Sequence, residues 1–527
     1  MDSAPSVTPG DDPFVGPIVP LNGDARKLVD RTREILHRTI HEPGSAFTQD
    51  IADSPTRGAT VSLGSLTLEL KQGTFRAHAF ESLTDRSHII ALSKGDITTE
   101  DPLLIRVHSE CITSETLGGC DCDCVEQLEG ALQAIADEGR GVVFYLRQEG
   151  RGAGYSLKGR DRMMVCASEN EVETFEAYKE LGLAPDERRY ERLRDVSYLL
   201  GIQAPLKVMT NNPDKIAGLE SLGFVVEDRR PLTIDPNPHN AYYLNTKGQN
   251  GHMLGENGTS STVAGYPWKV ETFAPHRLPD ALRFSHNASY PLPIRPMEGA
   301  LVLSPEDFYA LQDLQAEGEA PLVHSVEGLS FGKFRVQLTE AALKMMQEDP
   351  KSSLAQFVGH RPHWFNDHIY HDSVTGLDFV ALTYAERDDI VPLVRVHSEN
   401  LLDRFPLADE DETTKYQQSI DAIVSHGRGM LLLYPEDGRG KGFSSTFLER
   451  RLVEEGHATN STEASQMLGL GDDRRDYDAL AQLILHHCPE GRIRLIFTSQ
   501  ASIERKKPFL DLLKELGVDV EGYEFLQ

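Results

Sequence analysis

An internal repeat is the feature of this sequence that most constrains its fold. The segment Arg106–Glu110, with the sequence RVHSE, returns unchanged as Arg395–Glu399, at an offset of 289 residues. Four further landmarks return in the same order at offsets of 287 or 288: Gly139–Gly141 as Gly427–Gly429, Arg151 as Arg439, Asp186-x-Arg188-x-Tyr190 as Asp473-x-Arg475-x-Tyr477, and Thr210 as Thr498. Matches in a fixed order at a nearly constant offset indicate two copies of one domain.

Each copy is predicted to be mixed α/β. In the first copy, runs rich in Ile, Val and Leu predict strands over residues 88–97, 102–110, 141–150, 206–212 and 224–232. Apolar residues at helical spacing predict a helix over Cys124–Ala136, ending near Gly139, and a second helix over residues 214–223. The fold class expected is therefore α/β (mixed α+β), in two tandem domains.

Composition suggests where these domains begin and end. Residues 1–57 are expected to form an N-terminal tail and helical extension, and residues 58–254 the first domain. Residues 255–296, rich in Gly, Asn, Ser and Pro, are expected to be a linker. Residues 297–527 would then form the second domain.

Charge and apolar pattern exclude several classes of protein. A formal net charge of -29 argues against a nucleic-acid partner, which needs a basic surface. The sequence has no apolar run of 18 residues and no basic segment followed by an apolar one at its start, so neither a membrane span nor a secretory signal is expected. A cytoplasmic protein is predicted.

A cluster of cysteines is the strongest chemical signal. Cys111, Cys122 and Cys124 have the spacing C-x10-C-x-C, and Cys120 lies beside them. Three thiolates bind zinc and leave a fourth position open for water, whereas four would close the site into a structural one. The second copy has Asn400 in place of Cys111 and no cysteine before Cys488, which favours an open site that the fold does not need. Spacing alone leaves both arrangements open.

Three other segments carry groups suited to a nucleotide, each with a plainer interpretation. Arg147 and Arg151 lie in a Gly-rich segment after a predicted strand, where they would pair with phosphate, although such a segment is often a simple turn. Thr210 and Lys215 flank a helix start, which equally describes a capped helix with a surface lysine. The charged segment 186–190 taken alone is typical of a solvated surface.

Taken together, the motifs resemble those of GTP cyclohydrolase II. The resemblance covers residues 60–254 and includes RVHSEC, CDC, GRGVVFYLRQEGRG, DERRY, TNNPDKIAGLESLG and YYLNTKGQNGHML. It implies that Cys111, Cys122 and Cys124 are zinc ligands and that Asp186 and Arg188 are the catalytic proton acceptor and nucleophile. The nucleotide contacts that it implies are Arg106, Val107, His108, Ser109, Glu110, Gln127, Glu149, Gly150, Arg151, Thr174, Thr210 and Lys215.

The resemblance also implies a chemistry. In that family a zinc-bound water attacks the ring carbon between two nitrogens of GTP, formate leaves, and pyrophosphate is released with the help of Mg2+. One zinc per chain is expected, in the first copy, and the second copy is expected to be a degenerate partner domain. Because enzymes of this family are dimers, the two copies are expected to form an internal pseudo-dimer, or the chain a homodimer.

Two departures from the family pattern leave the substrate open. Asp121 stands where the family has an arginine, and residues 160–171 lack the tyrosine that helps the ring chemistry. GTP ring opening in the riboflavin pathway is the first expectation. Ring opening of a uracil nucleotide in uracil catabolism is the alternative, and a non-catalytic nucleotide-binding regulatory protein is an alternative of another class.

Overall fold

The structure is a computed structural model that describes residues 56–168, 172–184, 186–249, 283–317, 320–471 and 473–526. Residues 1–55 of the expected N-terminal tail and helical extension, and residues 255–282 of the expected linker, lie outside these ranges. The last two residues of the expected extension, Thr56 and Arg57, form a strand of the first sheet. Within them, none of the helices combines the length and the apolar character needed to cross a membrane.

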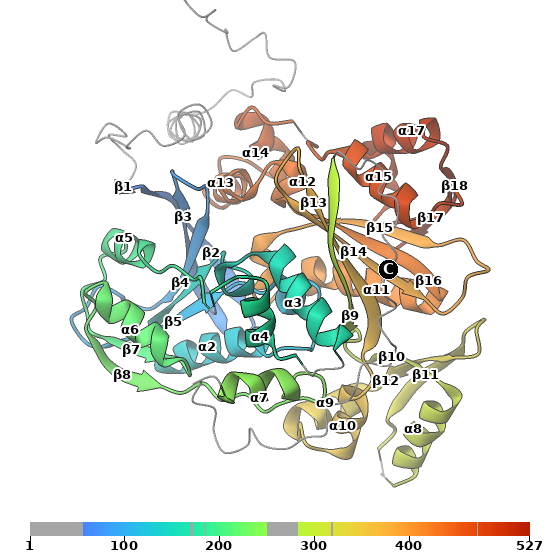
Figure 1. Cartoon of the computed structure of the whole chain (residues 1–527), viewed down its shortest axis with the longest axis horizontal. Coiled ribbons are helices and arrows are strands. Elements are labelled where there is room, and N and C mark those ends of the chain that lie inside the picture. The colour runs from blue at the N-terminus through green and yellow to red at the C-terminus, as the bar shows by residue number, and fades with distance from the viewer. Residues whose placement is uncertain are drawn as a thin grey trace, which may run out of the picture.

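The first repeat is built on one mixed sheet with the strand order β1-β2-β3-β4-β6-β5-β7-β8 (Figure 1). Strands β2, β3, β4 and β6 pair antiparallel, and β6, β5, β7 and β8 pair parallel. The sheet consists of β1 (Thr56–Arg57), β2 (Thr60–Leu70), β3 (Gly73–Ser82), β4 (His88–Lys94), β5 (Leu103–Ser109), β6 (Gly141–Leu146), β7 (Leu206–Met209) and β8 (Val226–Arg230).

Helices connect and cover these strands. The longest, α2, spans Cys124–Glu138, buries Leu128 and Leu132 on its sheet side, and ends at Gly139, whose φ of 76° is the left-handed conformation that stops a helix. The helix expected over Cys124–Ala136 is thus confirmed. The other helical elements are η1 (Ile112–Thr116), η2 (Gly150–Gly152), α3 (Tyr155–Ala167), α4 (Thr174–Glu180), α5 (Arg192–Leu199), α6 (Pro213–Ser221) and α7 (Ala241–Gln249).

The second repeat has a sheet of the same design, with the order β18-β17-β15-β16-β14-β13-β9. Its strands are β9 (Phe284–Ile294), β13 (His363–Asp372), β14 (Asp378–Ala385), β15 (Leu393–Ser398), β16 (Arg428–Tyr434), β17 (Arg492–Phe497) and β18 (Asp519–Phe525). Its helical elements are η4 (Leu401–Arg404), α11 (Glu410–His426), α12 (Asp437–Gly440), α13 (Phe443–Glu454), α14 (Ser461–Met467), α15 (Tyr477–His487), α16 (Gln500–Arg505) and α17 (Lys507–Glu515).

The expected linker is wrong at its C-terminal end, because residues 284–294 form β9 of the second sheet. Pro291 and Pro293 gave this segment the composition of a linker. They are tolerated because β9 is an edge strand. The carbonyl of Pro293 points away from β13 and accepts a hydrogen bond from the Cys120 amide at 2.9 Å, so its ring nitrogen faces the same outer side.

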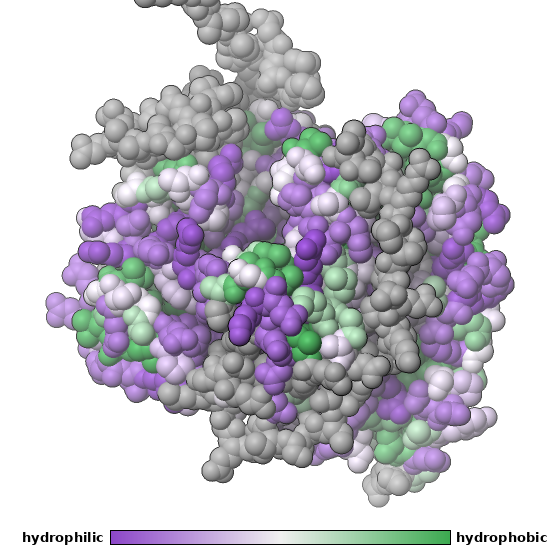
Figure 2. Space-filling view, viewed as in Figure 1, coloured by the Kyte–Doolittle hydropathy of each residue, from purple (hydrophilic) through white to green (hydrophobic). Residues whose placement is uncertain are grey.

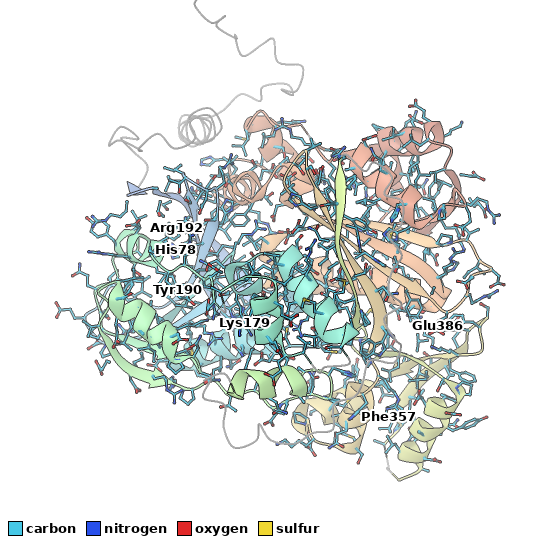
Figure 3. The ribbon with its side chains drawn as sticks, viewed as in Figure 1. His78, Lys179, Tyr190, Arg192, Phe357 and Glu386 are labelled. Carbon is cyan, nitrogen blue, oxygen red and sulfur yellow. The ribbon has the colours of Figure 1, made fainter. Side chains whose placement is uncertain are left out.

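The expectation of one continuous second domain over residues 297–527 also needs correction. A small unit precedes β13, with a three-stranded sheet in the order β10-β12-β11 and a separate apolar core that includes Phe357 (Figure 3). An ion pair of 2.5 Å between Lys333 and Glu386 connects it to the second sheet. The unit comprises β10 (Ala300–Leu303), α8 (Pro305–Glu317), β11 (Val323–Gly328), β12 (Phe334–Leu338), α9 (Glu340–Glu348) and α10 (Ser353–Gly359).

The two repeats share apolar cores. Helix α3 of the first repeat lies against β9 of the second (Figure 1), where Tyr155 packs in one cluster with Ala288 and Ile369. The approach is so close that a Cβ atom on Gly159 would lie 2.3 Å from the Ile369 side chain. In the converse arrangement, Phe443 and Phe447 of α13 complete the core over β2.

The surface visible in Figure 2 is mainly hydrophilic, with hydrophobic residues in scattered small groups. This agrees with 26% charged residues in the sequence and with the burial of the large apolar side chains between the layers.

Candidate active site

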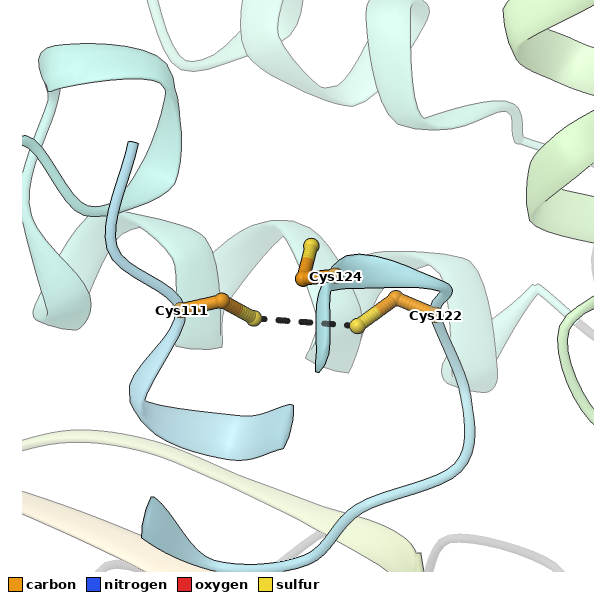
Figure 4. A group of neighbouring side chains, drawn as sticks. All are labelled: Cys111, Cys122 and Cys124. Atoms are coloured by element: carbon orange, nitrogen blue, oxygen red, sulfur yellow. Dashed lines mark hydrogen bonds between the residues drawn. The ribbon is translucent and has the colours of Figure 1, made fainter. Parts of the chain in front are cut away.

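Three cysteines converge beside the carboxyl end of β5. Cys111 lies two residues after the end of β5, and Cys124 is the first residue of α2. The sulfur atoms of Cys111, Cys122 and Cys124 lie within 4.8 Å of one another, and the first two are 3.6 Å apart (Figure 4). Such a group of soft sulfur ligands suits a zinc ion.

Cys120 does not join this group. Its thiol points toward the second repeat and donates a hydrogen bond to the Pro293 carbonyl at 3.4 Å. Burial raises the pKa of this thiol to about 12, which keeps it protonated at neutral pH. The geometry therefore brings three thiols together rather than four.

A buried lysine from α3 lies next to the thiols. The Lys158 ammonium is 3.1 Å from the Cys111 sulfur and 2.8 Å from both the Thr113 hydroxyl and a carboxylate oxygen of Glu149. Burial raises the pKa of Glu149 to about 7, although Lys158 acts against this shift. The Glu149 carboxylate also accepts hydrogen bonds from the backbone amides of Ile112 and Gly150. It therefore links the Gly-rich loop to the segment that carries Cys111.

Cys111 and Cys124 form part of the wall of a cleft that is open to solvent and lined mainly by polar and charged side chains. The residues predicted to contact nucleotide, zinc or the reacting groups line this cleft, with the exception of Arg147, Val107, Cys122 and Asp186. Arg147, predicted to pair with phosphate, instead pairs with Glu110 and Glu399 of the two repeats. The other three each contact a residue of the cleft wall. The Val107 carbonyl accepts from Lys215 at 2.9 Å, Cys122 contacts Cys111, and Asp186 pairs with Arg188.

Cations dominate one end of the cleft. Burial, with a smaller contribution from Arg188 and Arg106, lowers the pKa of Lys215 well below its usual range. Burial also lowers the pKa of Arg106 to about 10, and its guanidinium donates to the Met209 carbonyl and the Gln127 side chain. Buried cations that depress one another's pKa values form an environment that an anionic ligand would stabilise.

Asp186 and Arg188 form a direct pair in the loop before α5. The Arg188 Nε atom is 2.8 Å and 3.0 Å from the two carboxylate oxygens of Asp186. Although burial opposes it, Arg188 holds the pKa of Asp186 below its usual range. The two residues therefore face each other despite their i, i+2 spacing, because the segment is not helical.

The Gly-rich loop adopts a conformation that most residues avoid. Arg151 has a φ of 57°, and its guanidinium lies 5.3 Å from the centre of the Tyr178 ring. Its carbonyl accepts from the Glu187 amide, which joins this loop to the Asp186–Arg188 pair. A Cβ atom on Gly152 would lie 2.7 Å from the Glu187 backbone, so this contact requires glycine.

Several residues that line the cleft carry a buried polar atom without a hydrogen-bond partner in the described residues. These atoms include the hydroxyls of Ser109 and Thr174 and one carboxylate oxygen of Asp161. Since buried polar groups are nearly always hydrogen-bonded, these atoms point to a ligand or water in the cleft.

Sequence reasoning missed the residues that α3 and α7 bring to the cleft. Arg162 of α3 is 3.4 Å from Asp121, and both side chains are only 5% exposed. The Arg162 guanidinium lies 4.7 Å from the centre of the Tyr243 ring of α7. From the same helix, Lys247 binds Asp123 at 2.8 Å. Asp121 and the segment that contains Arg162 were singled out as departures from a family pattern, but nothing in the sequence indicated that they pair.

The second repeat also contributes to the surroundings of this site. Arg404 donates to the Glu110 carboxylate at 2.7 Å and lies 3.0 Å from the Tyr145 hydroxyl, with a side chain only 1% exposed. It also pairs with Glu399, the counterpart of Glu110. Arg147 lies 3.4 Å from Glu110 and 3.8 Å from Glu399. Two arginines thus neutralise two carboxylates where the repeats meet.

A family model described as GTP cyclohydrolase II matches residues 62–231 and 358–521, which together are more than half of the chain. The chain belongs to the GTP cyclohydrolase II family. The two matched ranges fall on the two large sheets, so the expected mixed α/β fold in tandem domains is confirmed. The expectation of a cyclohydrolase of this family is confirmed with it.

Individual relatives match the first repeat. The GTP cyclohydrolase-2 of Pseudomonas putida (strain GB-1) is 48% identical over 184 residues, covering 34% of this chain and 87% of that protein. The riboflavin biosynthesis protein RibBA of Chlorobium phaeovibrioides (strain DSM 265 / 1930) is 43% identical over 183 residues, covering 34% of this chain and 44% of that protein. A solved structure of RibBX, a two-domain 3,4-dihydroxy-2-butanone 4-phosphate synthase from A. baumannii, covers 39% of this chain and 44% of that chain. Its TM-score is 0.20 and its identity 16%, too low to bear on the site.

Proposed function

We propose that the first repeat is a zinc-dependent GTP cyclohydrolase II, which opens the guanine ring of GTP to give formate, pyrophosphate and a diaminopyrimidine product of the riboflavin pathway. The observation that carries this proposal is the convergence of three thiols on a cleft whose other end is lined by buried cations. The names of the relatives, GTP cyclohydrolase-2 and riboflavin biosynthesis protein RibBA, support the choice of substrate and pathway.

The residues present fit a zinc ion. Cys111, Cys122 and Cys124 would hold it, and because Cys111 and Cys124 line the cleft, the ion would be accessible to a substrate. When bound, zinc supplies Lewis-acid chemistry for hydrolysis. A second ion, Mg2+, is proposed to accompany the triphosphate, because Mg2+ commonly binds phosphate oxygens in such sites.

The other side chains of the cleft are assigned to binding the nucleotide and to the reaction at its phosphate. We assign Arg106, Arg151 and Lys215 to the phosphates, since all three line the cleft and the lowered pKa values of Arg106 and Lys215 mark positions where an anion would stabilise the charge. Arg188 is assigned to the α-phosphate as nucleophile, and Asp186, which accepts both hydrogen bonds from Arg188 Nε, is assigned as the acceptor of its proton. Thr174 and Ser109 would supply hydroxyls to the bound nucleotide.

Ring opening of a uracil nucleotide is the second candidate, and one observation favours it. Asp121 and Arg162 put a buried ion pair beside the thiols, where the family pattern has an arginine and a tyrosine. A changed set of charges beside the base would alter which base is accepted. The third alternative, a non-catalytic nucleotide-binding protein, is retained only for the second repeat, which has no equivalent thiols.

We further propose that the chain works in the cytoplasm as an internal pseudo-dimer. The six cysteines are all free, as expected in a reducing compartment. The shared apolar cores and the Arg404 contacts support close pairing of the repeats.

A single experiment tests the main proposal. Purified zinc-loaded protein is incubated with GTP, UTP, UMP or uridine, with and without Mg2+, and product masses are followed. Formate and pyrophosphate release from GTP is expected, with one zinc per chain by metal analysis. A ring-opened ureido product from UTP or UMP with inert GTP would replace the first candidate by the second, and no product from any nucleotide would overturn both.

A further inference from the structure

The sulfur atom of Cys111 lies beside two polar side chains. The Lys158 ammonium is 3.1 Å from this sulfur, and the Thr113 hydroxyl is 3.2 Å from it. All three side chains are buried. A sulfur atom accepts hydrogen bonds most strongly as a thiolate, which is also the form that binds a metal.

The chemistry of the two donors fixes the direction of these hydrogen bonds. An ammonium has three N–H donors and no acceptor. Lys158 therefore donates to the Cys111 sulfur, to the Thr113 hydroxyl oxygen at 2.8 Å and to a carboxylate oxygen of Glu149 at 2.8 Å. Because the Thr113 oxygen accepts from Lys158, its own proton can be donated to the sulfur. The sulfur thus receives one hydrogen bond from a cation and one from a hydroxyl.

A plainer role for Lys158 would be to neutralise Glu149, and the second repeat tests that role. Asp437 occupies the position of Glu149 at the offset of 288, and it is 2% exposed. Its carboxylate accepts from the Leu401 backbone amide at 2.6 Å, which is the counterpart of a contact that Glu149 makes in the first repeat. The residue that matches Lys158 is Thr446. The same contact therefore forms without a lysine beside the carboxylate.

The residues around the sulfur differ together between the repeats. The second repeat has Asn400, Leu402 and Thr446 where the first has Cys111, Thr113 and Lys158. A Cβ atom on Gly150 would contact Lys158, and one on Gly438 would contact Thr446, so the two helices present these side chains at the same place. The loop and its carboxylate persist where thiol, hydroxyl and ammonium are all replaced. The ammonium therefore accompanies the thiol rather than the loop.

We propose that Lys158 and Thr113 are positioning residues of the zinc centre, which act through the Cys111 thiolate. Their hydrogen bonds hold this sulfur in the orientation that faces Cys122 and Cys124, and they withdraw negative charge from it. This inference rests on the proposed function, because it assumes that a metal occupies the three thiols.

Charge explains why such donors are needed. Three thiolates carry more negative charge than a zinc ion carries positive charge, and an excess of charge is costly in a buried site. The Lys158 ammonium offsets this excess, although it shares its charge with Glu149. A hydrogen bond also makes the sulfur a weaker electron donor, which leaves the metal a stronger Lewis acid. Loss of a partner that orients a metal ligand commonly reduces metal affinity or activity by roughly 10- to 100-fold.

The test measures the zinc affinity of the full-length protein by competition with a chromogenic chelator. Lys158→Met removes the ammonium and should weaken zinc binding by roughly 10- to 100-fold. Thr113→Val removes the hydroxyl, keeps the size of the side chain and leaves Lys158 beside Glu149. It should weaken zinc binding by about tenfold, at the lower end of the same range.

The cobalt-substituted protein gives a second readout, which depends on neither affinity nor turnover. Loss of a hydrogen bond leaves the sulfur richer in electrons, so the sulfur-to-cobalt charge-transfer band should move to longer wavelength in both variants. Lys441→Met is the matched control, because it removes a buried lysine of the second repeat that pairs with Glu449 at 2.7 Å. It should leave zinc affinity and the cobalt spectrum unchanged, whatever it costs in stability.

Unchanged zinc affinity and an unchanged cobalt spectrum in Lys158→Met and Thr113→Val would overturn the inference, as would a natural chain that binds no zinc. If Lys158→Met does not fold, Thr113→Val decides by the same two readouts. The proposed function fails separately. Zinc binding that depends on Lys158, in a protein that turns over no nucleotide, would refute that function alone. Turnover of GTP with unaltered zinc affinity in both variants would refute the inference alone.

Discussion

The two repeats have the same sheet but different chemistry. Both contain a Gly-rich loop with an arginine at positive φ, 57° at Arg151 and 63° at Arg439, followed by an Asp–Arg pair at Asp186–Arg188 and at Asp473–Arg475. Among the residues that the structure describes, only the first repeat contains converging thiols. The comparison shows that the fold and its loops persist without the thiols, so the proposed metal would serve the reaction rather than the folding.

The shared RVHSE segment is placed in opposite electrostatic surroundings. In the first repeat, His108 lies 2.7 Å from the Glu115 carboxylate. At the offset of 289, the residue that matches Glu115 is Arg404, which binds Glu110 across the interface. The first repeat therefore has an acidic side chain at a position where the second has a basic one. This difference in charge favours contact between the two different repeats over contact between two identical repeats.

Removing a thiol should have the largest effect. Cys122→Ser is expected to lose the metal. Substitution of a residue that only supports a metal ligand commonly reduces activity by up to roughly a hundredfold, so loss of the ligand itself should reduce turnover by more than that. Cys120→Ser, a change in a thiol that only bonds the Pro293 carbonyl, should retain zinc and most of the activity. Metal analysis and initial rates check both variants, and two zinc ions per chain would contradict the asymmetry of the repeats.

Breaking the interface should have the next largest effect. Arg404→Met leaves the buried carboxylates of Glu110 and Glu399 without this partner and should lower the free energy of unfolding by about 3–5 kcal/mol. Arg450→Met is the control, because its pair with Asp403 is at 3.3 Å and its side chain is 32% exposed. That change should cost about 0–1 kcal/mol in urea denaturation. Similar losses in the two variants would show that Arg404 has no special role.

The Asp–Arg pairs distinguish the repeats by activity. Asp186→Ala and Arg188→Ala should each reduce turnover by at least about a hundredfold, or roughly 2.7 kcal/mol in the barrier, with little loss of stability. Asp473→Ala and Arg475→Ala should be much milder. Steady-state rates test this prediction, and thermal unfolding is the control for stability. Equal losses of turnover from substitutions in both repeats would show that the second repeat takes part in the reaction.

The smallest expected effect is on acid stability. Burial, then Arg395, Lys506 and Lys415, lowers the pKa of His397 from 6.5 to about 3. The unfolded chain therefore binds this proton first, and the resulting destabilisation is absent above pH 6.5 and grows as the pH falls toward 3. At pH 5 this destabilisation amounts to about 2 kcal/mol in the free energy of unfolding. Between pH 7.5 and 5, the stability of His397→Asn should therefore fall by about 2 kcal/mol less than that of the natural chain. The same loss of stability between pH 7.5 and 5 in His397→Asn and in the natural chain would contradict this expectation.

The sequence predicted the elements that follow local rules. The helix from Cys124 ends at Gly139, and the strands ending near Ser109 and Leu146 bring RVHSE and the Gly-rich loop to the same edge of the sheet. Because parallel neighbouring strands end together, segments read separately along the chain meet in one cleft.

What the sequence did not predict depends on contacts between distant segments. Pro291 and Pro293 look like linker residues unless β9 is known to be an edge strand. Lys158, Asp161 and Arg162 reach the cleft only because α3 packs between the Gly-rich loop and the second sheet. Arg404 comes from the other repeat, and no local pattern connects it with Glu110.

The shared cores also set an order of events during synthesis. Leu63 and Leu66 of β2 pack in one cluster with Leu401, Phe443 and Phe447. Between 335 and 384 residues separate these partners, so the part of this core that Phe443 and Phe447 cover stays open until α13 has been made. Most domains close their cores in the order in which they are translated. Here the core of the first repeat is completed only by a helix of the second, so it closes late in synthesis.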